Sequence, residues 1–192
     1  MGWVYLCEKE LTRLGCCKIL QAILHFYMAE RTEPRSAAPS PDDAAWMELA
    51  LEQAKAAGAA GEVPVGAVIV QGEEIVGLGQ NRNLRDHDPA AHAEIVALRQ
   101  AAARLENHRL VGCVMFVTIE PCAMCAGAMT HARLARLVYG ATDTKAGAAG
   151  SVLEVLNHPR LNHRIEVTSG VLAGRCSEIL QEFFRQKRDL QL

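Results

Sequence analysis

The chain lacks the features that assign a sequence to several large protein classes. Its longest apolar run, residues 16–27, is too short and too interrupted for a membrane-spanning helix, which needs about 20 apolar residues. No small-x-small cleavage site follows this run, so it is not a convincing secretory signal. The sequence also has no internal repeat and no glycine-rich phosphate-binding fingerprint. We therefore expect a globular protein with no membrane partner.

A strong charge of one sign is also missing. The chain carries 20 Lys and Arg against 22 Asp and Glu, a net charge of -2, which gives no overall sign of nucleic-acid binding. The charge is unevenly placed, however, because residues 42–98 hold 3 basic and 10 acidic side chains (net -7) and residues 99–192 hold 12 and 8 (net +4). A polyanion is expected to approach the second half, although a solvated surface of mixed charge explains the count equally well.

Length and composition indicate one folded domain with an appendage. The chain has 192 residues, 50% of them hydrophobic, which is enough for a packed core. We assign residues 1–41 to an N-terminal extension, a flexible linker with a short helix, and residues 42–192 to the folded domain. Met28 opens the linker, so we hypothesise that residues 1–27 come from an upstream start codon or an appended sequence. Seven irregularly spaced cysteines do not suggest a disulfide framework, which favours a reducing compartment, the cytoplasm.

Hydrophobic periodicity predicts that strands alternate with helices in the folded domain. The first helix is capped by Ser40 and ends at Gly58 or Gly61, and a later helix over 89–105 holds His92 and Glu94 in its first turn. The last helix is expected to bury Ile179, Leu180 and Phe183. Strands are predicted over 63–70, 75–79, 112–119, 137–141 and 165–168, helices also over 122–133 and 173–188, a helical turn at 152–156, and loops at 80–88 and 142–150. This alternation predicts a three-layer α/β/α domain.

Cys122 and Cys125 form the most informative pair. They lie three positions apart at a predicted helix start, so both sulfurs can face one point, and His92 from another helix start can complete a three-ligand metal site. Structural zinc usually has four protein ligands, whereas three leave a position open for a water molecule whose pKa the metal lowers. Glu94 points away from the His92 imidazole, which leaves its carboxylate free to move protons as a catalytic residue.

Plainer interpretations of these residues stay open. Cys122 and Cys125 could be a redox pair or half of a structural zinc site. A second Cys-x-x-Cys or a downstream His-x(3–5)-His would favour the structural site, and the sequence has no second Cys-x-x-Cys. A redox pair should follow a thioredoxin-like strand and gives no role to His92 or Glu94. Glu94 alone could be a solvated acid at a helix start.

Longer segments around these residues resemble the zinc-dependent nucleoside and base deaminases, whose known signature joins His-x-Glu to a later Pro-Cys-x-x-Cys. Within that superfamily the chain is similar to the bacterial tRNA-specific adenosine deaminases over about residues 46–188. The segments that carry the resemblance are Glu62-Val63-Pro64-Val65-Gly66-Ala67, Asn81-Arg82, residues 88–95, residues 118–128 and Gly147-Ala148-Ala149-Gly150-Ser151.

The resemblance implies a fold, a reaction and partners. It implies a cytidine deaminase-like domain with a five-stranded mixed sheet, one Zn2+ per subunit and a homodimer. The implied reaction is hydrolytic deamination of adenosine to inosine at the wobble position, 34, of an arginine tRNA anticodon, with a zinc-activated water and Glu94 as proton shuttle. The anticodon stem-loop is the implied partner. Matching motifs assign base and ribose contacts to Asn81 and the backbone near Ala93, and flanking-nucleotide contacts to Asp143, Lys145, Phe184 and Arg185; His158, Asn162 and His163 match a further segment near the RNA.

Several of these assignments have alternatives. Phe184 could be a core residue, and Lys145 and Arg185 could be solvated surface charges. A deaminase of a free base or nucleoside, such as guanine or cytosine, shares the zinc chemistry but needs no basic rim. From a different class, a zinc-stabilised RNA-binding module without turnover would have no need for a proton shuttle at Glu94.

Overall fold

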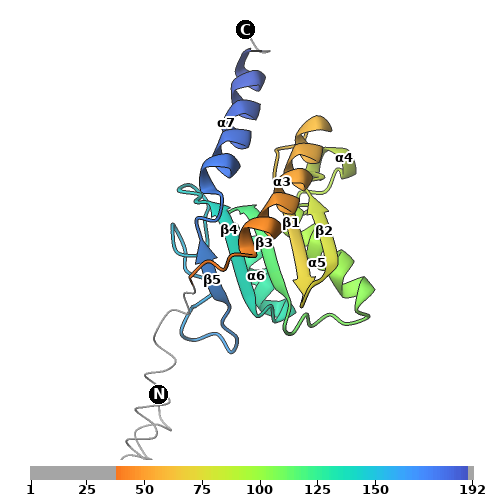
Figure 1. The fold of residues 1–192 in the computed structure, drawn as a ribbon, viewed down its shortest axis with the longest axis vertical. Coiled ribbons are helices and arrows are strands. Elements are labelled where there is room, and N and C mark those ends of the chain that lie inside the picture. Colours follow the sequence, from red (N-terminus) through yellow and green to blue (C-terminus); the bar gives the residue numbers. More distant parts are fainter. Residues whose placement is uncertain (1–37, 190–192) are drawn as a thin grey trace, which may run out of the picture. The chain divides into compact units, whose positions relative to one another are not determined.

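The computed structural model describes residues 38–189, and our predictions for residues 1–37 lie outside this part. Its five-stranded sheet consists of β1 (Gly66–Gln71), β2 (Glu74–Gln80), β3 (Val114–Ile119), β4 (Arg136–Ala141) and β5 (Glu166–Ser169). The strand order is β2-β1-β3-β4-β5. Strand β1 is antiparallel to β2 and β3, whereas β3, β4 and β5 are mutually parallel. The mixed five-stranded sheet is therefore confirmed (Figure 1).

Helices cover both faces of the sheet. One face packs against α3 (Asp43–Ala59) and α7 (Ala173–Asp189), the other against α5 (Ala93–Arg104) and α6 (Ala123–Ala132), and Figure 1 shows α3 in front of the sheet and α5 and α6 behind it. Side chains alternate between the faces along β1, because Ile69 packs with α5 and α6 while Val68 and Val70 pack with α3. Apolar residues on both sides of the strands produce the predicted three layers.

The strand directions bring three loops to one end of the sheet. Strand β2 is antiparallel to β1, which is antiparallel to β3, so β2, β3 and β4 all finish at the same end. The loop 81–92 follows β2, the Cys122 region follows β3, and the loop 142–151 follows β4. Segments that are far apart in the sequence thus meet at what we call the loop end of the sheet.

A buried ion pair lies at the opposite end. Arg136, at the start of β4, donates from Nη1 and Nη2 to the two carboxylate oxygens of Asp43, over 2.9 and 2.7 Å, and Asp43 is only 2% exposed. Burial tends to raise the pKa of Asp43, but hydrogen bonds from Arg136 and Ser40 outweigh it and hold the pKa below its ordinary value. The pair joins the start of α3 to the sheet.

Helix starts differ from the predicted ones by a few residues. Ser40 does not cap α3: the helix begins at Asp43 after Asp42, and the Ser40 N–H donates to the Asp43 carboxylate over 2.8 Å. Helix α5 begins at Ala93, so His92 is its N-cap and lies before the first turn. Cys122 is likewise the N-cap of α6. Both caps have extended backbone, with ψ of 154° and 172°.

Other predicted boundaries also need correction. The loop predicted at 80–88 contains a short helix, α4 (Asn83–Asp86), and residues 152–156 form no helical turn but an isolated bridge between Ala149 and Glu154. Ile179, Leu180 and Phe183 of α7 are only half-buried, and Cys176 is the buried residue of this helix. Ile179 and Leu180 nevertheless pack against the buried core. Within residues 38–189 no helix has the length and hydropathy that crossing a bilayer requires.

Candidate active site and metal centre

The structure brings the three predicted metal ligands together. His92 Nδ1 lies 3.7 Å from Cys122 Sγ and 3.5 Å from Cys125 Sγ, and the ligand atoms are all within 4.8 Å of one another. A tetrahedral zinc ion with ordinary Zn–N and Zn–S bonds separates its nitrogen and sulfur ligands by about 3.6 Å. The observed spacing therefore fits zinc. In the described part of the chain, no second group of His, Cys, Asp or Glu meets this criterion.

Helix geometry explains why these side chains converge. His92 and Cys122 cap α5 and α6, and Cys125 lies one turn into α6, so all three face the N-terminal ends of two helices. The positive ends of helix dipoles favour thiolates. Hydrogen bonds from the Cys125 thiol and from His92 lower the pKa of Cys122 to about 3, whereas the bond to Cys122 and burial raise the pKa of Cys125. Zinc would require both sulfurs as thiolates, so its binding would release the Cys125 proton.

Glu94 is buried beside the ligands. It lies in the first turn of α5, is 3% exposed, and interacts with the Cys125 thiol. The interpretation as a solvated acid at a helix start is therefore wrong. Burial raises the pKa of Glu94, against an opposing hydrogen bond from its own backbone N–H. A carboxyl with a raised pKa in a dry site is suited to both accepting and donating a proton.

Asn81 bonds to Ala93, the residue that precedes Glu94. Asn81 Oδ1 accepts a hydrogen bond of 2.9 Å from the Ala93 N–H, and both residues are buried. The bond satisfies one of the free N–H groups at the start of α5. Because an N–H can only donate, the oxygen of the Asn81 amide must face Ala93. The structure thus connects the predicted base-contacting residue to the helix that carries Glu94.

The loop 142–151 closes over the cysteine side of the site. The Ala148 N–H donates to the Pro121 carbonyl over 2.8 Å, and Gly147 forms a β-bridge with Cys122. Asp143 shapes the loop, since its Oδ1 accepts from the N–H groups of Lys145 and Ala146, over 2.8 and 3.2 Å. The predicted active-site loop therefore lies against the metal ligands, with Asp143 acting on its conformation.

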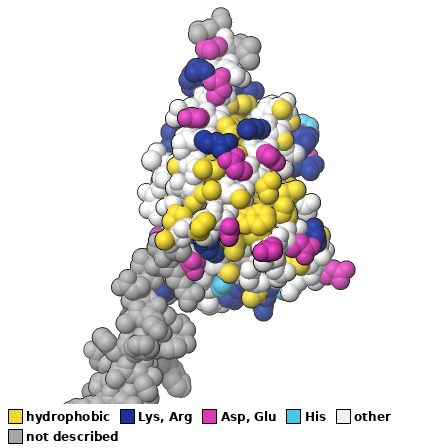
Figure 2. All heavy atoms as spheres, viewed as in Figure 1, with side chains coloured by type: hydrophobic (Ala, Val, Ile, Leu, Met, Phe, Trp, Pro, Cys, Tyr) yellow, Lys and Arg dark blue, Asp and Glu magenta, His cyan; other side chains and the backbone are white. Residues whose placement is uncertain are grey.

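A basic groove separates this loop from α7. A cavity of about 600 Å³ is lined by Lys145, Leu180, Gln181, Phe184, Arg185 and Arg188. Phe184 is 46% exposed, so its interpretation as a core residue is wrong. Three cations and no acid line the groove, although α7 as a whole carries both signs of charge (Figure 2). The structure therefore brings together the predicted contacts Lys145, Phe184 and Arg185.

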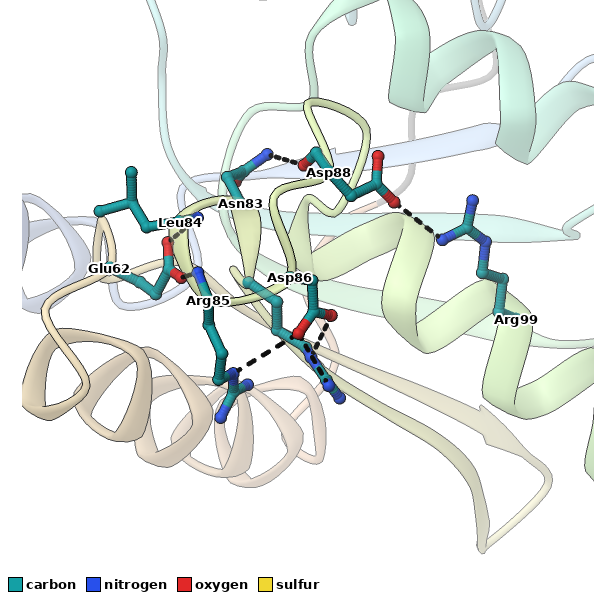
Figure 3. Close-up of polar contacts among 8 residues, drawn as sticks. Glu62, Asn83, Leu84, Arg85, Asp86, Asp88 and Arg99 are labelled. Carbon is teal, nitrogen blue, oxygen red and sulfur yellow. Dashed lines mark hydrogen bonds and ion pairs between the residues drawn. The ribbon is translucent and has the colours of Figure 1, made fainter.

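Two buried glutamates at the loop end had no role in the sequence prediction. Glu62 accepts hydrogen bonds from the N–H groups of Leu84 and Arg85, over 3.1 and 2.8 Å, and so caps α4 (Figure 3). Glu120, just before Pro121, accepts bonds from the loop 142–151. Both lie inside the matched motifs, and a long-range contact of this kind leaves no periodic signal in the sequence.

The structural-zinc interpretation finds no support among the described residues. Four residues lie between His158 and His163, a spacing found for histidine pairs in structural zinc sites. They are not part of the group formed by His92 and the two cysteines. His163 Nε2 instead lies 2.7 Å from the Leu134 carbonyl. The geometry therefore favours a three-ligand site. The RNA contacts implied for His158 and His163 stay a prediction.

Comparisons with known proteins agree with this site. A family model described as MafB19-like deaminase matches residues 41–188. The chain is 49% identical over 148 residues to the tRNA-specific adenosine deaminase of Haemophilus influenzae, which covers 77% of this chain and 86% of that protein. It is 42% identical over 161 residues to the tRNA-specific adenosine deaminase of Agrobacterium fabrum, with 84% and 98% covered.

Solved structures show the same similarity. One from a study of A-to-I editing by tRNA:A34 deaminases at the wobble position of transfer RNA has a TM-score of 0.69 and 43% identity, covering 71% of this chain and 99% of that chain. A guanine deaminase from Nitrosomonas europaea has a TM-score of 0.65 and 28% identity, covering 82% and 91%. The chain therefore belongs to the MafB19-like deaminases by its family model and to the tRNA-specific adenosine deaminase family by its curated relatives.

Proposed function

We propose that this protein converts adenosine to inosine at position 34 of an arginine tRNA anticodon. The observation that carries the chemistry is the buried carboxyl of Glu94 beside His92, Cys122 and Cys125. A binding module without turnover has no use for a carboxyl in that position. The choice of tRNA adenosine as substrate is supported by relatives at 42–49% identity.

The reaction replaces the C6 amine of adenine by oxygen. His92, Cys122 and Cys125 would hold one Zn2+, which would lower the pKa of the attacking water. Glu94 is the residue that moves the protons: it accepts one from the attacking water and donates it to N1 of the base, as the water oxygen bonds to C6. It then transfers the second proton to the amine, so that the C6–N bond breaks and ammonia leaves. The low exposure of Glu94 keeps bulk water from competing for these protons.

Asn81 is proposed to hold the base and ribose. Its Oδ1 is engaged by the Ala93 N–H, so its amide N–H groups are the donors that it offers to a substrate. Ala93 is fully buried and its N–H is occupied. We therefore assign Ala93 a positioning part, in which it keeps the Asn81 amide in one orientation.

The basic groove is proposed to hold the nucleotides that flank position 34. An exposed aromatic ring stacks on any base, and Lys and Arg contact phosphates. Phe184 supplies the ring, and Lys145, Arg185 and Arg188 supply the charges. Asp143 holds Lys145 in place through the loop backbone. A free base would leave all of these groups unused, which favours RNA. The resemblance further implies a homodimer in which both subunits contact the anticodon loop, and the cytoplasm as its location.

A deamination assay tests the proposal. Inosine formation is measured on an arginine tRNA anticodon stem-loop and compared with the deamination of free adenosine, guanine and cytidine, with Glu94→Ala protein as control. We expect turnover of the stem-loop alone. The similarity to a guanine deaminase at 28% identity makes guanine the main competitor. Turnover of guanine without the stem-loop would overturn the proposed substrate and leave the chemistry intact.

A further inference from the structure

Glu120 is a buried carboxylate that gathers four hydrogen bonds from one loop. Its Oε2 accepts from the Asp143 N–H over 3.1 Å and from the Ser151 hydroxyl over 2.5 Å. Its Oε1 accepts from the N–H groups of Ala149 and Ser151, over 3.0 and 3.1 Å. Glu120 is 2% exposed, and it takes part in none of the ion pairs within residues 38–189. Backbone N–H groups and a hydroxyl thus stabilise the buried negative charge, as a cation does in a buried ion pair.

The loop is folded tightly around this carboxylate. A Cβ at Gly147 would lie 2.4 Å from Glu120 Cδ and 2.5 Å from the Asp143 carbonyl oxygen, so only glycine fits there. The four donors come from both ends of the loop, Asp143 on one side and Ala149 and Ser151 on the other. The loop has few large side chains with which to build a core of its own. Its conformation therefore depends on the carboxylate at its centre.

We propose that Glu120 is a positioning residue that presets the loop 142–151 for RNA, a proposal that rests on the function proposed above. The loop carries Lys145 into the basic groove and lies against Pro121 and Cys122. If the loop is already ordered before binding, RNA binding does not have to offset the conformational entropy lost on ordering it. The hydrogen bonds of the Glu120 carboxylate all go to residues 143–151, so Glu120 acts through the loop.

A carboxylate is required because both oxygens accept. In Glu120→Gln the amide nitrogen must face either Asp143 and Ser151 Oγ or the N–H groups of Ala149 and Ser151. In either orientation its hydrogens would face at least one backbone N–H, which can only donate, so that part of the loop would be freed. Glu62→Gln is the matched control, because Glu62 is equally buried and also accepts backbone N–H bonds, but from α4.

Hydrogen exchange tests the anchor independently of any activity. In the zinc-loaded Glu120→Gln protein we expect amides of residues 142–151 to exchange at least tenfold faster, with the strands unchanged. In Glu62→Gln the amides of Leu84 and Arg85 should exchange faster and those of 142–151 should not. Unchanged exchange of residues 142–151 in Glu120→Gln, or equal loosening in both variants, would overturn the proposal.

A double-mutant cycle tests the consequence for RNA. Glu120→Gln should raise the KM for the stem-loop about tenfold or more, with a smaller change in kcat. Lys145→Ala should raise the KM in the wild-type background but add little to Glu120→Gln, because both changes remove the same contact. Additive effects would exclude action through the loop. If the protein does not deaminate the stem-loop at all, the proposed substrate fails, while the exchange experiment still decides the role of Glu120.

Discussion

The two ends of the sheet bury carboxylates in different ways. At the loop end, Glu62 and Glu120 are held by backbone N–H groups and one hydroxyl. At the opposite end, Asp43 is held by the guanidinium of Arg136. The burial of the three carboxylates is the same, about 2% exposure. What differs is whether the partner carries a charge.

We infer from this difference that one end of the sheet serves the stability of the fold and the loop end serves the reaction. A guanidinium neutralises a buried carboxylate and joins two elements of the fold. Next to a site that must attract a divalent cation, such a positive charge would oppose metal binding. Dipoles order the loops without adding a cation. We therefore expect changes at the loop end to alter metal content, rate or KM, and changes at the Asp43 end to alter the free energy of unfolding alone.

The largest effect is expected from the metal ligands. Cys122→Ala removes one of three ligands of the site, so the protein should lose its zinc and all measurable activity. Zinc per subunit, measured on purified protein, checks this. Cys176→Ala provides a control, because that buried cysteine lies on α7 away from the ligand group. Full zinc content in Cys122→Ala protein would contradict the three-ligand assignment.

A smaller effect on rate, without loss of metal, is expected at Glu94. Glu94→Gln keeps the shape of the side chain but cannot accept the proton, so kcat should fall by about 10²–10⁴-fold. The zinc content should stay at the wild-type value, which distinguishes this variant from Cys122→Ala. Near-normal turnover would exclude Glu94 as the shuttle. A reduced kcat together with an unchanged zinc content would assign proton transfer to Glu94 and thus place the reaction at the loop end of the sheet.

The opposite end is expected to respond in stability only. Arg136→Met leaves the Asp43 carboxylate buried without its partner and should lower the free energy of unfolding by about 3–5 kcal/mol, with kcat of the folded protein unchanged. Chemical denaturation measures the first quantity and the stem-loop assay the second. A changed kcat would break the proposed separation between the two ends.

The same pair gives stability a predictable dependence on pH. The folded state holds the pKa of Asp43 below its ordinary value. The ionised pair therefore stabilises the fold fully above about pH 4 and loses this contribution as the pH falls through the lowered pKa. The difference in unfolding free energy between wild type and Asp43→Asn should shrink in that acid range. A constant difference down to pH 2 would contradict the assignment.

The smallest effect is expected in the basic groove. Phe184→Ala removes a stacking surface worth about 1–3 kcal/mol per base, so the KM for the stem-loop should rise by roughly 5- to 150-fold, with little change in kcat. Val111→Ala is a matched control, because Val111 is also an exposed apolar residue but follows α5, away from the groove. Equal effects of the two substitutions would mean that the groove does not hold RNA.

Much of the fold was predictable because its signals are local. Hydrophobic patterns located the strands and the longer helices, and their alternation predicted the three layers, whereas the mixed sheet was implied by the family resemblance. Boundaries failed where a distant side chain decides them. The short helix α4 exists because Glu62, 22 residues earlier in the chain than Leu84, caps it. Ser40 does not act as the predicted N-cap. Its N–H instead donates to the Asp43 carboxylate, which is also bound by the distant Arg136.

The sequence by itself determined which residues are the candidates for the chemistry, because spacing at a helix start allows Cys122 and Cys125 to share an ion with a histidine, and motifs point to His92 and Glu94. Tertiary structure alone decided how the site is supported. It buried Glu94, exposed Phe184 beside Lys145, and placed Glu120 inside a loop that begins 22 residues later. Ligand spacing is a property of a few neighbouring residues, whereas burial and loop anchoring depend on strand directions, which bring distant segments to one end of the sheet.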